Sequence, residues 1–287
     1  MPKTCIICGR RAGSREHTFP AALGGRRTNK GIYCGPHNQG FSHLAKIITQ
    51  QLKSINALLA VRPDHEDSAE PFDYTSPEGE QLVIFDGAVQ RAGPGAADSD
   101  RSLHVQLKVG GPDGLRSIAY IALTFFAHHF QDCARQSGLD AIKGFLLGNG
   151  DNAFVWWEGP HTALPPNPFP FGHTIVLMTS ATTQEATAFA SLFQSLHFGI
   201  HLGTLSRLTD KSMVVFIDPQ ADKAPSDIEE HKDDTVVKQQ AQLGTTLSCD
   251  GELEALPSMT SGSADDRTDR GRRPRKAQNP IRCALLR

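Results

Sequence analysis

The sequence predicts an α+β fold, and three observations carry that prediction. Residues 1–42 are rich in Gly and Cys and contain no long periodic segment. Apolar residues then recur at helical spacing in 43–61, and a mostly apolar stretch over 115–138 reads as a buried helix. Alternating or continuous apolar runs typical of strands follow later in the chain. We therefore expect a small N-terminal module, 1–62, followed by a mixed α+β domain, 101–219.

The N-terminal module is expected to end in an amphipathic helix over residues 43–61. Pro63 ends this helix, because a proline pushes the residue before it out of the helical region. Its apolar face consists of Leu44, Ile47, Ile48, Leu52, Ile55, Leu58 and Leu59.

Residues 63–100 form an expected acidic connector between the two domains. Asp, Glu, Pro, Gly and Ser are frequent there, and residues 64–100 contain ten acidic residues against the single Arg91. Within the connector, QLVIFDG (81–87) and the following AVQRAG predict a short hairpin.

The second domain, 101–219, contains two expected helices and several expected strands. The apolar helix over 115–138 follows a turn at 110–114 and stops at Gly138, and a short helix starts at Leu139. The segment from Thr187 to Ser206 fits both periods in part, and we interpret it as a hairpin. The other expected strands are SLHVQLKV (102–109), AFVWWEG (153–159), HTIVLMTS (173–180) and SMVVFIDP (212–219).

The tail, residues 220–287, is expected to be disordered. It is rich in Asp, Ser, Thr, Gln and Gly, and its end is basic.

Composition limits the classes to which the chain can belong. Apolar residues make up 39 % of the sequence, and the mean hydropathy is -0.32. Both values are typical of globular proteins, and no apolar stretch reaches the roughly 20 residues of a membrane span. The start lacks the apolar core of a signal peptide, and the six cysteines do not form a disulfide framework. We expect a cytoplasmic protein without a membrane partner.

Positive charge is concentrated at the start of the chain. Residues 1–53 contain nine Lys or Arg against Glu16, a net charge of 9 − 1 = +8. Such a block is typical of a surface that faces phosphates, although it can also serve only to keep a small domain in solution.

Two pairs of metal-ligating residues lie near the N-terminus. Cys5 and Cys8 form a C-x2-C pair, and Cys34 and His37 form a C-x2-H pair. The two-residue gap lets both ligands of a pair face one ion, so four ligands predict a closed Cys3His site for a structural Zn²⁺. The alternative is a set of buried thiols beside an unrelated histidine.

Between these pairs lies the stretch Glu16-His17, Pro20 and Gly24-Gly25, and two asparagines complete the pattern. Asn29 precedes Cys34, and Asn38 follows His37. In this order the residues resemble the HNH endonucleases with the ββα-metal fold, in the subset whose hairpin and helix are held together by a zinc ion. The resemblance covers about residues 5–45.

The resemblance implies a role for each of four residues. His17 would be the general base, and Asn29 would orient the loop and this base by hydrogen bonding. Glu16 would be a ligand of the catalytic Mg²⁺ or Mn²⁺, and Asn38 a second ligand of that ion. The family more often has Asp or His at the first ligand position and His at the last. The implied activity is hydrolysis of phosphodiester bonds in nucleic acid, with duplex DNA as the expected substrate.

Elementary chemistry agrees with these roles. A neutral imidazole can take a proton from water near neutral pH, and carboxylate and amide oxygens suit Mg²⁺ or Mn²⁺. The alternative is a zinc-finger module without catalytic activity that binds nucleic acid or protein. In the nuclease interpretation, the 101–219 domain would supply dimerisation, target choice or regulation, with a homodimer as one expected state. His128 and His129 lie in the apolar helix and are expected to be core or partly buried residues rather than ligands.

Overall fold

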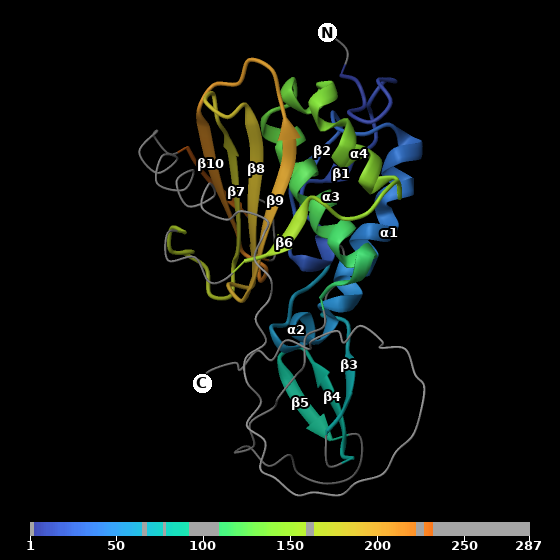
Figure 1. Cartoon of the computed structure of the whole chain (residues 1–287). Helices are drawn as coiled ribbons and strands as arrows, with labels where there is room; N and C mark the ends of the chain where they lie inside the picture. The colour runs from blue at the N-terminus through green and yellow to red at the C-terminus, as the bar shows by residue number, and fades with distance from the viewer. Residues whose placement is uncertain are drawn as a thin grey trace, which may run out of the picture.

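The fold is taken from a computed structural model of the chain. The structure describes residues 3–64, 68–76, 79–91, 109–158, 164–221 and 227–231. The predicted mixed α+β class is confirmed. Helices pack on one face of a large sheet, and a smaller sheet lies next to α2 (Figure 1). The predicted strand over 102–109 falls almost wholly outside the described residues.

The large sheet has six strands in the order β11-β10-β7-β8-β9-β6, and every neighbouring pair is antiparallel. The segment that fits two periods is the hairpin of β8 and β9, as predicted. The strands are β6 (Val155–Trp157), β7 (His173–Thr179), β8 (Glu185–Leu192), β9 (Leu196–Thr204), β10 (Lys211–Ile217) and β11 (Asp227–His231).

Side chains alternate across this sheet because successive residues of a strand point to opposite faces. Ile175 and Leu177 of β7 join the main core beneath the helices. Val176 and Met178 join a smaller apolar cluster on the other face, against which Phe169 packs. Both faces of β7 are therefore covered, which explains its continuous apolar sequence.

Strand β11, at the edge of the large sheet, corrects the prediction of a tail disordered from residue 220. Asp227–His231 pairs with β10 in register, with Ile217 opposite Asp227. The stretch contains only one strongly apolar residue, Ile228, so its sequence gives no strand signal. Residues 222–226 and 232–287 lie outside the described part of the chain.

Helix α1 (Gly35–Gln51) begins eight residues before the predicted helix and ends earlier. Cys34 is its N-cap, and Pro36 lies in the first turn, where its missing N–H costs no hydrogen bond. The chain turns at Leu52 before α2 (Lys53–Leu58). At this turn the Gln51 amide bonds to the backbone N–H and carbonyl of Gly110, a tertiary contact that periodicity cannot reveal.

Helix α3 (Gly111–His129) also starts earlier and ends earlier than predicted. The expected turn at 110–114 is mostly its first turn, with Pro112 near the N-terminus. After Phe130 the chain continues in 3-10 turns, Cys133–Arg135 and Ser137–Leu139, and then in α4 (Asp140–Leu146).

The predicted hairpin in the acidic connector is present and belongs to a three-stranded antiparallel sheet. Its strands are β3 (Phe72–Thr75), β4 (Gln81–Phe85) and β5 (Ala88–Arg91). Of these three strands, only β3 has no counterpart in the prediction from the sequence. In the part of the chain that the structure describes, no helix is long and apolar enough to cross a membrane.

A short hairpin occupies the stretch between the two predicted ligand pairs. Its strands are β1 (Glu16–His17) and β2 (Thr28–Asn29), joined through a 3-10 turn at Ala21–Leu23. Gly24 has φ 92°, and a side chain on Gly25 would collide with the carbonyl oxygen of Phe19. The paired glycines therefore allow the turn that the sequence predicts.

One core connects the N-terminal segment with the sheet. The same cluster of buried side chains includes Cys5, Leu44 of α1, Phe125 of α3 and Phe198 of β9. Helices α1 and α3 pack side by side, and α3 lies against β8 and β9 (Figure 1). The segments predicted as two domains, 1–62 and 101–219, thus bury apolar surface against each other.

Candidate functional site

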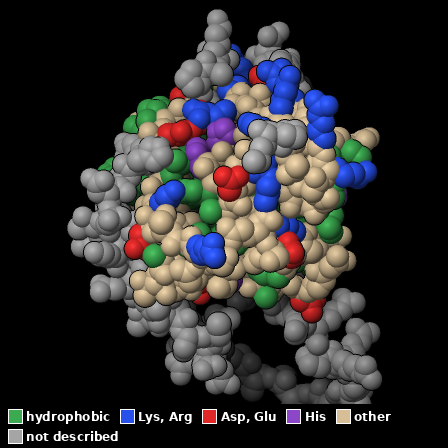
Figure 2. Space-filling model, turned by 90° about the horizontal axis from the view of Figure 1, so that it is seen from above, with side chains coloured by type: hydrophobic (Ala, Val, Ile, Leu, Met, Phe, Trp, Pro, Cys, Tyr) green, Lys and Arg blue, Asp and Glu red, His purple; other side chains and the backbone are tan. Residues whose placement is uncertain are grey.

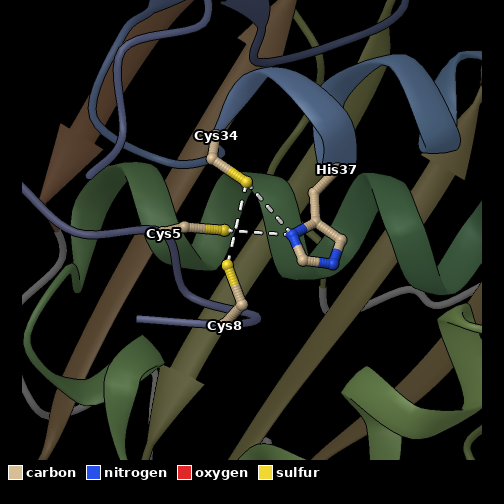
Figure 3. A group of neighbouring side chains, drawn as sticks. All are labelled: Cys5, Cys8, Cys34 and His37. Carbon is tan, nitrogen blue, oxygen red and sulfur yellow. Dashed lines mark hydrogen bonds between the residues drawn. The ribbon is translucent and has the colours of Figure 1, made fainter. Parts of the chain in front are cut away.

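Four side chains converge where the N-terminal loop meets the start of α1 (Figure 3). Their ligand atoms all lie within 4.8 Å of one another, and the four residues could hold a metal ion. The Sγ atoms of Cys8 and Cys34 are 3.7 Å apart, and His37 Nδ1 lies 3.5 Å from Cys5 Sγ and 3.2 Å from Cys34 Sγ. A tetrahedral ion would place such atoms about 3.6 to 3.8 Å apart, so the separations fit four-coordination.

Local backbone geometry explains this convergence. The Gly9 N–H donates to the Cys5 carbonyl oxygen at 2.9 Å, which closes a tight turn and brings Cys5 and Cys8 to one side. Gly9 has φ 70°, a conformation that favours glycine. Cys34 and His37 lie at the N-cap and in the first turn of α1, so the start of one helix presents both side chains.

The thiols of this cluster differ in their tendency to ionise. Burial raises the pKa of Cys5. Burial also works against ionisation of Cys8, but hydrogen bonds led by the Arg10 guanidinium lower the pKa of its thiol to about 6. A thiolate is the form that binds a metal, so Arg10 prepares Cys8 as a ligand.

The hairpin divides the predicted catalytic residues between its two faces. Glu16 lies opposite Asn29 in the register, and His17 lies opposite Thr28. Cross-strand partners share a face, whereas neighbours along a strand do not. Glu16 and Asn29 therefore face α3 together, and His17 faces the other way.

Glu16 is engaged by α3. The Tyr120 hydroxyl donates a hydrogen bond to Glu16 Oε1. Burial raises the pKa of Glu16 to about 7, although the Tyr120 bond works in the opposite direction. A carboxyl group that is half protonated near neutral pH and already bonded to a phenol is a poor ligand for Mg²⁺ in this arrangement.

Asn29 is also held by α3. Its Oδ1 accepts from the Gly31 N–H at 2.7 Å, and its Nδ2 lies 2.7 Å from Nδ1 of His128. The bond to Gly31 holds the loop after β2, and the hydrogen-bond partners of the Asn29 side chain, Gly31 and His128, do not include His17. The partner His128 has a pKa that burial lowers, with further lowering from Arg27 and Lys3.

His17 has a carboxylate partner. Its Nε2 lies 3.1 Å from Oδ2 of Asp64, and both side chains are partly exposed, at 31 % and 27 %. An ionised carboxylate only accepts hydrogen bonds, so Nε2 carries the proton that Asp64 accepts and Nδ1 has the lone pair. The pair thus gives one tautomer of the imidazole and leaves Nδ1 as its basic nitrogen.

Asn38 lies in the first turn of α1, next to the cysteine cluster. Its Nδ2 donates to the Arg15 carbonyl oxygen at 3.4 Å. Its Oδ1 is buried and has no hydrogen-bond partner among the described residues. Buried amide oxygens are normally satisfied, so this atom is available to a cation or a water.

Internal contacts engage several residues of the predicted basic block. Arg27 pairs with Asp227 and Glu229 of β11, and Lys53 pairs with Glu70. The side chains that remain exposed are Lys3, Arg10, Arg11, Arg15, Lys30 and Lys46. Figure 2, a view onto the end that carries the N-terminus, shows Lys and Arg side chains scattered over this face rather than joined in one stripe.

Asp64 and Tyr120 have no counterpart in the sequence-based prediction, and His128, which contacts Asn29, is predicted there only as a core or partly buried residue. Tyr120 and His128 are eight residues apart on α3, so both point towards the hairpin. Their segment is apolar enough to predict only a buried helix. Asp64 follows Pro63 in an acidic stretch, where no pattern distinguishes it from its neighbours.

Comparison with known proteins provides no relative from which a function could be carried over. No family model, no curated protein and no solved structure matches the chain. The function must therefore be argued from the residues and their geometry.

Proposed function

We propose that the chain is a metal-dependent endonuclease that hydrolyses phosphodiester bonds in DNA, with His17 as the general base. The contact between His17 and Asp64 is the observation that carries this proposal. It gives a partly exposed imidazole a fixed orientation and tautomer, which a base needs and a surface histidine lacks.

The proposed step uses Nδ1 of His17. This nitrogen removes a proton from a water, the resulting hydroxide attacks phosphorus, and the bond from phosphorus to the leaving oxygen breaks. The leaving oxygen takes a proton from solvent. Arg15 is exposed, and its Nε donates to Thr28 Oγ1 at 3.0 Å. Thr28 lies opposite His17 in the register, so the guanidinium is on the face of His17, where it can contact the phosphate.

We propose Zn²⁺ for the cluster of Cys5, Cys8, Cys34 and His37. Three thiolates and an imidazole in tetrahedral arrangement suit zinc, and four protein ligands leave no position for a reacting water. The ion would hold the N-terminal loop to α1 and so support the hairpin between them.

Mg²⁺ or Mn²⁺ at Glu16 and Asn38 fits the structure only in part. Asn38 Oδ1 is a suitable ligand, whereas Glu16 is engaged by Tyr120. When bound, such an ion would stabilise charge on the phosphate and the leaving oxygen. In the proposed step, the residues of this chain that act on the water are His17, as the base, and Asp64, which orients it.

Plasmid cleavage with Mg²⁺ or Mn²⁺ tests the proposal. We expect His17→Ala to lower the cleavage rate by about a hundredfold or more, which is the usual contribution of a general base. Asp64→Asn should cause a smaller loss and change the pH profile, because it alters the tautomer. His43→Ala is the matched control, since His43 is exposed on α1 and bonds only to the Gly40 carbonyl oxygen.

One result would contradict the nuclease proposal. If the wild type holds zinc but cuts no duplex, single strand or RNA, the chain is not a nuclease. The alternative, a zinc-finger module that binds nucleic acid or protein, would then stand. The engagement of Glu16 by Tyr120 and of Asn29 by His128 favours this alternative, because both residues have structural partners.

A further inference from the structure

A second group of metal-ligating side chains lies between the end of α3 and strand β11. It consists of His128, His129 and Glu229, whose ligand atoms all lie within 4.8 Å of one another. The two histidines and the glutamate are about a hundred positions apart in sequence, and none belongs to the predicted nuclease site. Two imidazoles and a carboxylate are a common ligand set for transition metals.

Both carboxylates and cations surround this group. Asp227 Oδ2 lies 2.9 Å from Arg27 Nε, and Glu229 Oε1 bonds to the same guanidinium. Lys3 adds a second positive charge near His128, so an ion would be held by its ligands and not by a net negative charge. Asp227 Oδ1 is buried and has no hydrogen-bond partner among the described residues. The carbonyl end of α3 adds partial negative charge at the same place.

We propose that His128, His129 and Glu229 bind a divalent transition-metal ion of the Zn²⁺ or Co²⁺ class. The ion would take one oxygen of Glu229 while Arg27 holds the other. Three protein ligands leave a coordination position for water, unlike the closed cysteine cluster. The site would also tie β11 to α3, so the ion would stabilise the strand at the edge of the sheet.

Asn29 weakens this site, because its NH₂ group lies 2.7 Å from Nδ1 of His128. Gly31 holds the Asn29 amide with its NH₂ group towards the ring, which favours a proton on Nε2. The ion needs that proton on Nδ1 instead, as in most metal-bound histidines. A carboxylate in place of this amide would offer one oxygen to Gly31 and another to Nδ1–H, so Asn29→Asp should tighten binding by about tenfold.

A Co²⁺ titration of the full-length protein, followed by absorbance and metal analysis, tests the proposal. The cysteine cluster gives intense thiolate charge-transfer bands, and the second site gives only weak ligand-field bands. We expect two bound equivalents, of which the one without thiolate bands is lost in His128→Gln and in Glu229→Gln. Glu70→Gln is the matched control, because Glu70 is an exposed acid paired with Lys53.

Two results would overturn the proposal of a second metal site. A wild type that binds a single equivalent, with thiolate bands, overturns the proposal, as does a second equivalent that survives both variants with unchanged affinity. Circular dichroism of the variants shows whether they are folded, and retained thiolate bands show that the cysteine cluster is intact. Unchanged or weaker binding in Asn29→Asp would overturn the role given to Asn29.

Discussion

Glu16 and His17 show how two neighbouring residues acquire different chemistry from the face of a strand on which they lie. Glu16 points towards α3, where burial raises its pKa to about 7 and Tyr120 bonds to it. His17 points away from α3 and meets Asp64. Adjacent positions in the sequence thus supply one carboxyl that α3 engages and one imidazole that meets a carboxylate on the other side of the hairpin.

The raised pKa of Glu16 makes stability depend on pH. Its carboxyl is protonated more readily in the folded chain than in the unfolded chain, so folding is opposed increasingly as pH rises from about 4.5 to about 7. Glu16→Gln removes this cost. We expect the gain in unfolding free energy from the substitution to be about 2 kcal/mol larger at about pH 8 than at about pH 5.5.

Urea unfolding of both proteins at the two pH values measures this difference. Titration of the cysteine cluster affects the unfolding free energy of both proteins alike, so it cancels in the difference between them. A gain that is equal at both pH values would mean that Glu16 ionises normally in the folded chain.

At the scale of elements, the loop of the β1–β2 hairpin is fastened to the large sheet by one buried histidine. His173 at the start of β7 lies 3.0 Å from the Leu23 carbonyl oxygen through Nε2 and accepts from the Phe193 N–H at 3.1 Å through Nδ1. The bond from Phe193 requires the neutral ring, because Nδ1 can accept only without a proton, and the proton on Nε2 then serves the Leu23 carbonyl oxygen. Burial lowers the pKa of His173 to about 3, although the bond to Leu23 works in the opposite direction.

We expect His173→Ala to lower the unfolding free energy by about 2 to 4 kcal/mol, since it leaves a cavity and two backbone groups without partners. The wild-type contribution is complete above about pH 6.5 and declines as pH falls towards 3, because the unfolded ring then takes up a proton that the folded ring refuses. The loss caused by the substitution should therefore shrink in acid.

Chemical denaturation across this pH range, with the exposed His43→Ala as control, checks the expectation. A loss that stays constant with pH would show that the ring is not held neutral in the folded protein.

At the scale of the whole molecule, the N-terminal segment and the large sheet share one core. Leu44 of α1 is fully buried and lies in the same cluster as Phe198 of β9. Helix α3 lies between them and contacts both. Because each part covers apolar surface of the other, we expect them to unfold together.

Leu44→Ala tests this coupling. We expect it to lower the unfolding free energy by about 2 to 5 kcal/mol, the usual cost of such a cavity. The two tryptophans, Trp156 and Trp157, lie on β6, the edge strand opposite β11, so their fluorescence reports on the sheet. The fluorescence transition should shift as far as the circular dichroism transition. A fluorescence transition that does not move would show that the two parts unfold independently.

The sequence predicts the elements of this chain better than their ends. Strands β7 and β10, the hairpin of β8 and β9, and the apolar helix are recognisable from local periodicity. The starts of α1 and α3 are not, because each begins within a Gly-Pro stretch that also fits a turn. Strand β11 escapes prediction because its pairing with β10, and not its own composition, makes it a strand.

The sequence by itself identified the four residues of the cysteine cluster, because each short pair needs only local geometry to bring its own two side chains together. The meeting of the two pairs, which joins residues 26 to 32 positions apart, is tertiary. The sequence also identified His17 as a candidate base. Only the tertiary structure decided the partners: Asp64 for His17, Tyr120 for Glu16, and the group formed by His128, His129 and Glu229. The physical reason is distance along the chain, since these contacts join residues 47 to about 100 positions apart, and no local pattern encodes them.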